Sequence, residues 1–167
     1  MNGSPYVISV VAKSGSGKTT LIERILPVLK GRGLSVGVLK HHHHESSFDT
    51  PGKDTFRIAE AGADIVVGAS PVQVAAFRRC DGSADLDGVI DQHFAGLDLV
   101  LIEGYKRGSY PKIEVNRRAR SNQLVCAPDE IIAVISDQWW ELGVPCFGLN
   151  DIEGIASFVV DAAHRSN

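Results

Sequence analysis

The sequence predicts a three-layer α/β fold with a mostly parallel sheet, because segments typical of buried strands alternate with segments typical of amphipathic helices. In the first such unit, a β-branched run at residues 7–11 stops at a loop of small residues, and helical spacing begins at Lys18. A second apolar run, residues 99–102, ends in a carboxylate and a glycine, as central strands do beside a ligand crevice. The apolar runs 63–68 and 72–77 are joined by too few residues for a parallel crossover, so they predict an inserted β-hairpin.

The composition is that of one globular domain, residues 1–167. Hydrophobic residues make up 44% of the chain and charged residues 22%, which suits a single substantial core. The formal net charge of −3 favours no nucleic-acid partner. No apolar run is long enough to span a bilayer and no targeting segment is recognisable, so we expect a cytoplasmic protein without a membrane partner. The three cysteines are widely spaced, and we expect buried free thiols.

The loop after the first strand matches a phosphate-binding pattern. Residues 12–19 read Ala-Lys-Ser-Gly-Ser-Gly-Lys-Thr, which is the Walker A pattern with Ala12 at its first position. Its glycines let backbone N–H groups turn toward phosphate oxygens, and the following helix N-terminus favours anions. We expect Lys18 to reach the terminal phosphates and the Thr19 hydroxyl to ligate Mg²⁺. An ordinary strand-to-helix turn is the alternative. The predicted nucleotide-binding residues are Gly15, Ser16, Gly17, Lys18, Thr19 and Thr20.

The carboxylate that ends the second apolar run is the candidate catalytic residue. Glu103 closes the predicted strand 98–103 and precedes Gly104. In a Walker B strand such an acid holds the magnesium ion, directly or through water, or orients an attacking water. We therefore predict that Thr19 and Glu103 are the protein's metal ligands. The alternative is a carboxylate that only ends a strand.

The other elements follow from spacing and from helix-terminating residues. Residues 18–30 predict a helix that contains Pro27 and ends at the glycines 31 and 33, and residues 35–40 predict a second buried strand. Asp54 is a candidate cap for a helix over 55–61, and residues 86–94 predict a short amphipathic helix. Residues 112–116, 131–135 and the short run 145–149 read as strands, and Asp151 is a candidate cap for the last helix.

A run of four histidines follows the second strand, at His41 to His44. Imidazole is a common ligand of transition metals, but alternate residues of an extended chain point in opposite directions. Three interpretations stay open: a polar cluster beside the nucleotide, a solvated loop, and a metal site. Similarly, Asp49 and Asp54 are either ligands of magnesium-bound water or turn and cap residues.

A basic group, Arg117, Arg118 and Arg120, follows the predicted strand 112–116. Its simplest interpretation is a solvated surface, with a partner or phosphate contact as the alternative. GTPases commonly bind guanine through a carboxylate in an Asn/Thr-Lys-x-Asp pattern, and this pattern is absent from the sequence. Asp137 and Asp151 are the nearest candidates for that role, and both are also plausible helix caps.

Taken together, these motifs resemble the molybdopterin-guanine dinucleotide biosynthesis adaptor protein B family, over nearly the whole chain and in order. That family also has Ala at the first Walker position, as this chain does at Ala12. The motifs that carry the resemblance are Ala12-x-x-Ser-Gly-x-Gly-Lys-Thr-Thr20, Lys40-His41-x-His43-His44, Pro51-Gly52-Lys53-Asp54-Thr55, Asp98-Leu-Val-Leu-Ile-Glu-Gly-Tyr-Lys106 and Asn150-Asp151-Ile-Glu-Gly154.

The resemblance implies a P-loop GTP-binding adaptor with Mg²⁺ as cofactor and weak GTPase activity. Such a protein acts with the guanylyltransferase that joins GMP to molybdopterin, and it is a homodimer. The resemblance favours the polar-cluster interpretation of the histidines, which would line the site between nucleotide and partner. From charge, the pterin phosphate would meet Lys106 and Arg107. The further site candidates are Lys40, His41, His43, His44, Lys53, Asp54 and Lys106.

Three other functions are compatible with a phosphate loop. A small ATP-dependent kinase needs a base near the loop, for which Asp49 or Glu103 could serve, and it usually has an arginine-bearing lid. A dimeric ATPase switch of the plasmid-partition type would use Lys13 toward its partner's nucleotide. A nickel-insertion GTPase would use the histidines as metal storage.

Overall fold

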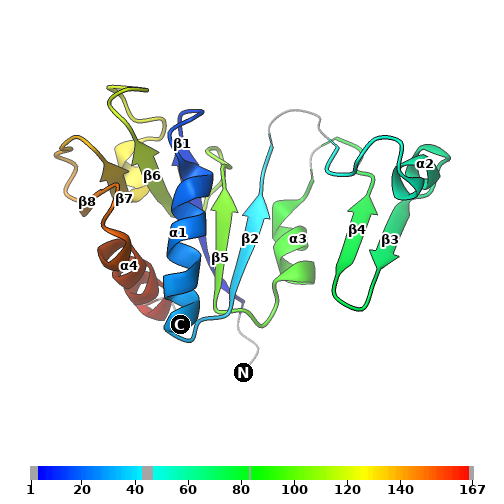
Figure 1. Cartoon of the computed structure of the whole chain (residues 1–167). Coiled ribbons are helices and arrows are strands. Elements are labelled where there is room, and N and C mark those ends of the chain that lie inside the picture. The colour runs from blue at the N-terminus through cyan, green and yellow to red at the C-terminus, as the bar shows by residue number, and fades with distance from the viewer. Residues whose placement is uncertain (1–3, 43–46, 83, 166–167) are drawn as a thin grey trace. The chain divides into compact units, whose positions relative to one another are not determined.

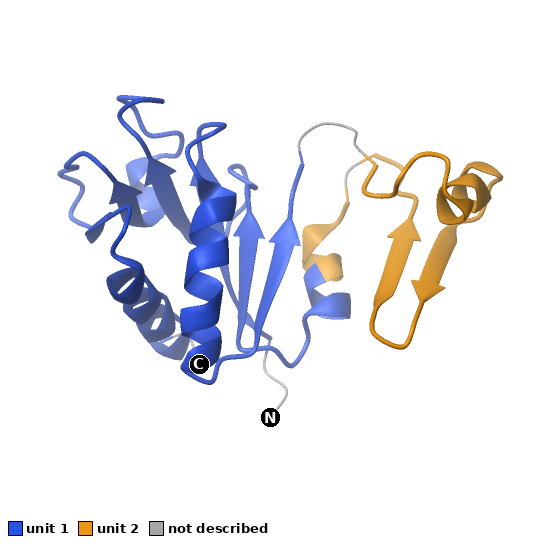
Figure 2. Ribbon diagram, viewed as in Figure 1, with its two compact units in different colours: residues 1–43, 90–167 blue, residues 44–89 orange. Residues whose placement is uncertain are grey.

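The computed structural model describes residues 4–42, 47–82 and 84–165. Clustering of its contacts gives two compact units, residues 1–43 with 90–167 (unit 1) and residues 44–89 (unit 2), shown in Figure 2. The elements of unit 1 are β1 (Tyr6–Ala12), α1 (Lys18–Gly31), β2 (Val36–Lys40), β5 (Leu99–Glu103), β6 (Lys112–Asn116), a 3₁₀ turn (Pro128–Glu130), β7 (Ile131–Ser136), β8 (Cys146–Gly148) and α4 (Ile152–Arg165). Unit 2 holds α2 (Asp54–Glu60), β3 (Ile65–Ala69) and β4 (Val74–Arg78), and α3 (Leu86–His93) crosses the boundary along the sequence.

Unit 1 is built on a six-stranded sheet with the order β2-β5-β1-β6-β7-β8 (Figure 1). Every neighbouring pair in it is parallel, which confirms the predicted α/β class. β1 pairs with β5 so that Val10 is opposite Glu103, and it pairs with β6 so that Ala12 is opposite Val115. The loops that follow β1, β5 and β6 therefore leave the sheet at the same end, the carboxyl end of the parallel strands.

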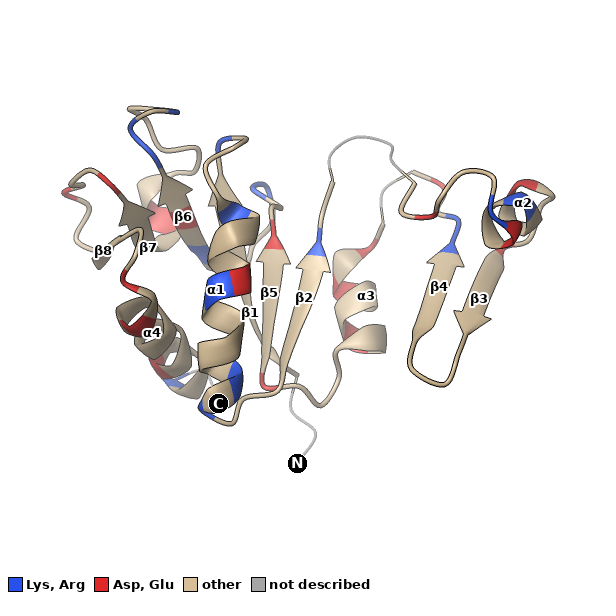
Figure 3. Ribbon diagram, viewed as in Figure 1, with Lys and Arg blue, Asp and Glu red and all other residues tan. Residues whose placement is uncertain are grey.

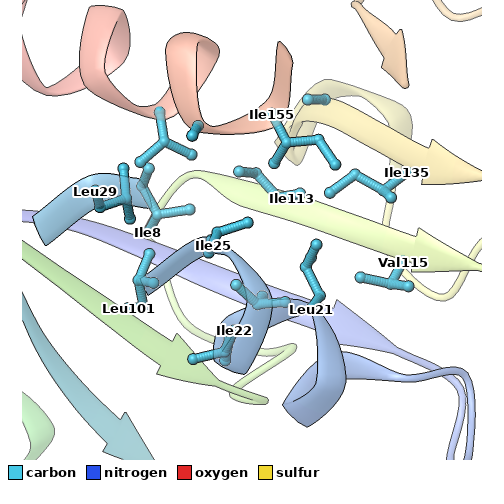
Figure 4. Close-up of a cluster of buried hydrophobic side chains, with 14 of the residues drawn as sticks. Ile8, Leu21, Ile22, Ile25, Leu29, Leu101, Ile113, Val115, Ile135 and Ile155 are labelled. Atoms are coloured by element: carbon cyan, nitrogen blue, oxygen red, sulfur yellow. The ribbon is translucent and has the colours of Figure 1, made fainter. Parts of the chain in front are cut away.

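The main core lies between the sheet and the helices α1 and α4 (Figure 4). α1 buries the residues whose spacing predicted the helix, and it continues through Pro27 to Gly31. Burial of these side chains is what stabilises the helix, since each contributes about 1.5–3 kcal/mol. The buried side chains that meet there are Ile8, Leu21, Ile22, Ile25, Leu29, Leu101, Ile113, Val115, Ile135 and Ile155.

Unit 2 contains the predicted hairpin as a separate two-stranded antiparallel sheet of β3 and β4. Among the described residues, β3 and β4 pair only with each other, and β3 packs against α2 within the same unit. Val66 is buried, whereas Ile65, Val67 and Val74 are 46%, 55% and 69% exposed. The hairpin therefore has one covered and one open apolar face.

The cysteines differ from the expectation in how far they are buried. The cysteines are free thiols, but Cys80 is exposed and Cys126 and Cys146 are half-buried rather than buried. Cys80 follows the end of β4, and Cys126 lies in the loop after β6, so neither sits inside a core-facing element.

Among the described residues, no helix is both long enough and apolar enough to cross a bilayer.

Candidate functional site

The loop between β1 and α1 has the backbone that a phosphate-binding turn needs. Gly15 and Gly17 have φ values of +75° and +99°, in the left-handed region where a glycine carries no steric penalty. Ser16 N–H donates to the Lys13 carbonyl at 3.2 Å, and α1 begins directly after Gly17. The first N–H groups of a helix have no partner within it, so those of residues 18–20 are available to an anion at this end.

The two residues predicted to share a cation are in contact. The Thr19 hydroxyl donates to Glu103 Oε1 at 2.6 Å, although the two residues are 84 positions apart. They meet because β5 lies beside β1, which places the end of β5 next to the first turn of α1. The Glu103 side chain is 13% exposed. A hydroxyl and a carboxylate at this spacing are oxygen ligands of the type that Mg²⁺ binds.

Lysines surround this single carboxylate. Lys40 Nζ lies 3.9 Å from Glu103 Oε2, because β2 pairs with β5 in a register that places Lys40 opposite Glu103. Burial lowers the pKa of Lys18; the negative charge of Glu103 opposes that shift, and the positive charges of Lys106 and Lys40 add to it. Figure 3 shows this concentration of charge at the carboxyl ends of β2 and β5. Three cations near one carboxylate suit a polyanionic ligand.

The turn after Glu103 packs against the residue after Lys40. His41 N–H donates to the Glu103 carbonyl at 3.1 Å, and the His41 and Tyr105 rings lie 4.9 Å apart. Gly104 has a φ of +101°, and a Cβ placed on it would lie 3.1 Å from the His41 carbonyl oxygen. Tyr105 has a φ of +61°, which is uncommon for a residue with a side chain. The backbone at this point is thus bent sharply around the Glu103 position.

The structure does not address every candidate. His43 and His44 lie outside the described residues, so the interpretation of the histidine run remains a prediction. Among residues 4–42, 47–82 and 84–165, no group of three or more His, Cys, Asp or Glu side chains is placed to hold a metal ion.

Lys53, Asp54 and Asp49 belong to unit 2, at and before the start of α2. The Asp54 carboxylate accepts the N–H of Thr55 at 2.8 Å, and the Asp49 carboxylate accepts the N–H of Thr50 at 2.8 Å. These local contacts are typical of turn and helix-start residues, which was the alternative for both aspartates. α2 begins at Asp54 itself, one residue earlier than predicted.

The two candidates for reading guanine have different surroundings. The Asp151 carboxylate accepts the N–H of Gly154 at 3.0 Å, and so caps α4. Asp137 follows β7, and its carboxylate accepts the N–H of Arg118 at 2.8 Å. Asp137 therefore holds the start of the basic segment rather than a helix.

The basic group after β6 meets the simplest sequence interpretation, a solvated surface, only in part: Arg118 and Arg120 are exposed, whereas Arg117 is half-buried. Arg117 Nε donates to the Ser16 carbonyl at 2.9 Å, so this side chain is fixed against the phosphate loop rather than free in solvent. The Arg120 guanidinium lies against Gly15, where a Cβ would be 3.3 Å from its Cζ. The contact arises because β6 is the other neighbour of β1 in the sheet. Predicting this contact requires the order of the strands in the sheet, which the sequence pattern alone does not give.

Comparison with known proteins gives one consistent family. A family model described as Molybdopterin guanine dinucleotide synthesis protein B matches residues 7–137. The chain is 36% identical over 170 residues to the molybdopterin-guanine dinucleotide biosynthesis adapter protein of Escherichia coli K12, covering 96% of this chain and 95% of that protein. A crystal structure of molybdopterin-guanine biosynthesis protein B aligns with a TM-score of 0.73 at 33% identity, covering 95% of this chain and 99% of that one. The crystal structure of Bacillus subtilis MobB aligns with a TM-score of 0.75 at 30% identity, covering 93% and 96%.

Proposed function

The chain belongs to the molybdopterin guanine dinucleotide synthesis protein B family, and from this premise we propose that it is a GTP-binding adapter with weak GTPase activity. It assists the attachment of GMP to molybdopterin and works in the cytoplasm. Its partners are the guanylyltransferase that performs the transfer and the molybdopterin substrate.

The contact between Thr19 and Glu103 is the observation that carries this proposal. A hydroxyl at the start of α1 and a carboxylate at the end of β5 meet at 2.6 Å, directly beside a loop with two left-handed glycines. In phosphate-loop proteins the corresponding pair faces the magnesium ion, and the loop surrounds the phosphates. Lys18 would contact the terminal phosphates, and its lowered pKa marks a cation that gains from a nearby anion.

Magnesium would be held by Thr19 and Glu103. When bound, the ion neutralises negative charge on the phosphate oxygens and so lowers the barrier to hydrolysis. Glu103 can also hold an attacking water in line with the terminal phosphate. The proposal takes the weak rate of hydrolysis from the family resemblance.

The proposal assigns the remaining site candidates to the side of the nucleotide site that would face the partner. Lys40, His41 and Lys106 lie at the ends of β2 and β5, next to Glu103, and are placed to contact an anion beyond the nucleotide. The phosphate of molybdopterin is such an anion, and Lys106 with Arg107 would meet it. The proposal includes His43, His44, Lys53 and Asp54 on the grounds of the family resemblance alone.

The proposal also includes a homodimer. The open face of the hairpin carries Ile65, Val67 and Val74, and exposed apolar strands of this kind usually pair with another surface. A second copy of the chain is the occupant we propose.

The experiment that tests this function compares nucleotides by thermal shift. The purified chain is heated with GTP, ATP, GDP or ADP at equal concentration, with Mg²⁺ present. A ligand that binds the folded state raises Tm in proportion to RT ln(1 + [L]/Kd), so we expect GTP to raise Tm clearly more than ATP does. An equal or larger shift with ATP would favour the kinase or partition-type ATPase instead.

A further inference from the structure

We propose that Arg117 and Arg120 form a clamp, supplied by this chain itself, that holds the nucleotide at its α-phosphate and nucleoside end. The inference rests on the proposed binding of GTP and assigns two residues to it. The two guanidinium groups lie along one flank of the phosphate loop. Arg117 is bonded to the Ser16 carbonyl, and Arg120 faces Gly15.

The glycines of the loop leave space for these groups. A Cβ on Gly17 would lie 3.4 Å from Nη2 of Arg117, and a Cβ on Gly15 would lie 3.3 Å from Cζ of Arg120. Arg117 donates its Nε–H to the Ser16 carbonyl, and this bond leaves the N–H groups of Nη1 and Nη2 for other acceptors. Within the described parts of the chain, the Arg120 side chain has no hydrogen-bonding partner. Guanidinium groups match the geometry of phosphate oxygens, and they also stack on planar bases.

The segment that carries the arginines is held in place by β6. Alternate residues of this strand, Lys112, Glu114 and Asn116, are polar and yet at most 3% exposed. Glu114 accepts the N–H groups of Val125 and Cys126 at 2.8 and 3.2 Å, and burial raises its pKa. Burying such groups is costly unless they are hydrogen-bonded, so their contacts indicate a loop with a fixed position.

Further bonds anchor the same loop. Asn116 Nδ2 donates to the Gln123 carbonyl at 3.2 Å, and Gln138 Nε2 donates to Asn116 Oδ1 at 2.6 Å. At the far end of the loop, Glu130 Oε1 accepts from Lys112 Nζ at 2.8 Å, and Lys112 is itself fixed by donating to the Gly108 carbonyl, before β6, at 2.7 Å. The arginines are thus presented by a pre-organised segment, which reduces the entropy lost when a ligand binds.

Strand order indicates which end of the nucleotide the arginines face. β1 lies between β5 and β6. Thr19 and Glu103, which would hold the cation, meet on the β5 side of the loop, and the cation would neutralise charge on the terminal phosphates. The terminal phosphates therefore lie toward β5, which leaves the α-phosphate and the nucleoside on the β6 side with Arg117 and Arg120. A clamp at this end contacts GDP as well as GTP.

The test measures the affinity of the full-length chain for Mg–GTP and Mg–GDP by calorimetry. We expect Arg117→Ala and Arg120→Ala each to weaken both nucleotides, by about tenfold or more and by similar factors, since each loses a charge-assisted contact. Arg118→Ala is the matched control: it removes the same charge two residues from Arg120, and Arg118 is likewise exposed, but its side chain is not among the atoms nearest Gly15 and Gly17. We expect it to change affinity by much less.

Arg120→Ala separates contact with the nucleotide from support of the loop, because the Arg120 side chain makes no hydrogen bond within the described residues that could be lost; the bond of its backbone N–H to the Arg117 carbonyl is kept. Arg117→Lys keeps the charge but not the Nε contact, and we expect it to recover only part of the affinity. If both alanine variants behave like Arg118→Ala while the parent chain binds GTP, the clamp is wrong and the proposed function stands. A loss for GTP without a loss for GDP would place the arginines at the γ-phosphate and overturn the assignment. If the parent chain binds no nucleotide, the clamp and the proposed function both fail.

Discussion

Lys18→Ala is expected to lower the affinity for Mg–GTP by about 100-fold or more, while the fold stays intact. Lys18 would supply two charge-assisted contacts to the terminal phosphates, and losing both costs on the order of 3 kcal/mol. The side chain makes no hydrogen bond within the described protein, and its pKa is lowered by burial and by the charges of Lys106 and Lys40. Removing it therefore costs the empty protein little. Calorimetric titration at fixed salt measures the effect.

Lys30→Ala is the matched control, because Lys30 lies in the last turn of the same helix. At 1.5 Å per residue, it is about 18 Å along the helix axis from Lys18, which is beyond the screening length at physiological salt. We expect GTP affinity to change little. If Lys18→Ala binds GTP as tightly as the parent chain does, the loop is not a phosphate site.

Ile25→Ala is expected to reduce the free energy of unfolding by about 2–5 kcal/mol, the usual cost of a cavity left in a well-packed core. Ile25 is 1% exposed and lies in the cluster between α1, α4 and the sheet. Urea denaturation followed by circular dichroism gives the difference. The loss follows from the central position of α1, which joins the phosphate loop to the core.

Ile58→Ala makes the same chemical change at a surface position on α2, where Ile58 is 52% exposed. Surface changes of this kind usually stay within about 0.5 kcal/mol. Equal destabilisation by the two variants would show that the core is not centred on α1.

The elements of unit 1 were predictable because their signals are local. The 3.6-residue spacing of Leu21, Ile25 and Leu29 gave α1 to within a residue, and the apolar runs gave the buried strands. The candidate phosphate loop and Glu103 were also predicted from local patterns, and the structure brings Thr19 and Glu103 into contact because β5 lies beside β1.

What the sequence could not give is the arrangement of elements far apart along the chain. The hairpin was predicted from its short connection, but the packing of β3 on α2 was not. The contact between Arg117 and Ser16 spans 101 positions and exists only because β6 neighbours β1. An arginine in a polar loop reads as solvated until strand order is known.

β6 shows the same limit in its burial. Its alternation of polar and apolar residues is typical of a strand with one face in solvent. Both faces are nevertheless buried, because Lys112, Glu114 and Asn116 hydrogen-bond to the chain before and after the strand. Hydrogen bonds of that kind depend on tertiary structure, and no spacing rule contains them.

The central claim is that Glu103 acts at the cation opposite the phosphate loop. Glu103→Gln tests it most directly, because the amide keeps the size of the side chain and an oxygen that can still accept from the Thr19 hydroxyl, but removes the charge. The measurement compares the affinity for Mg–GTP with the single-turnover rate of hydrolysis. The account predicts that the rate falls by a larger factor than the affinity. Equal losses in rate and affinity would contradict it and mark Glu103 as a structural residue.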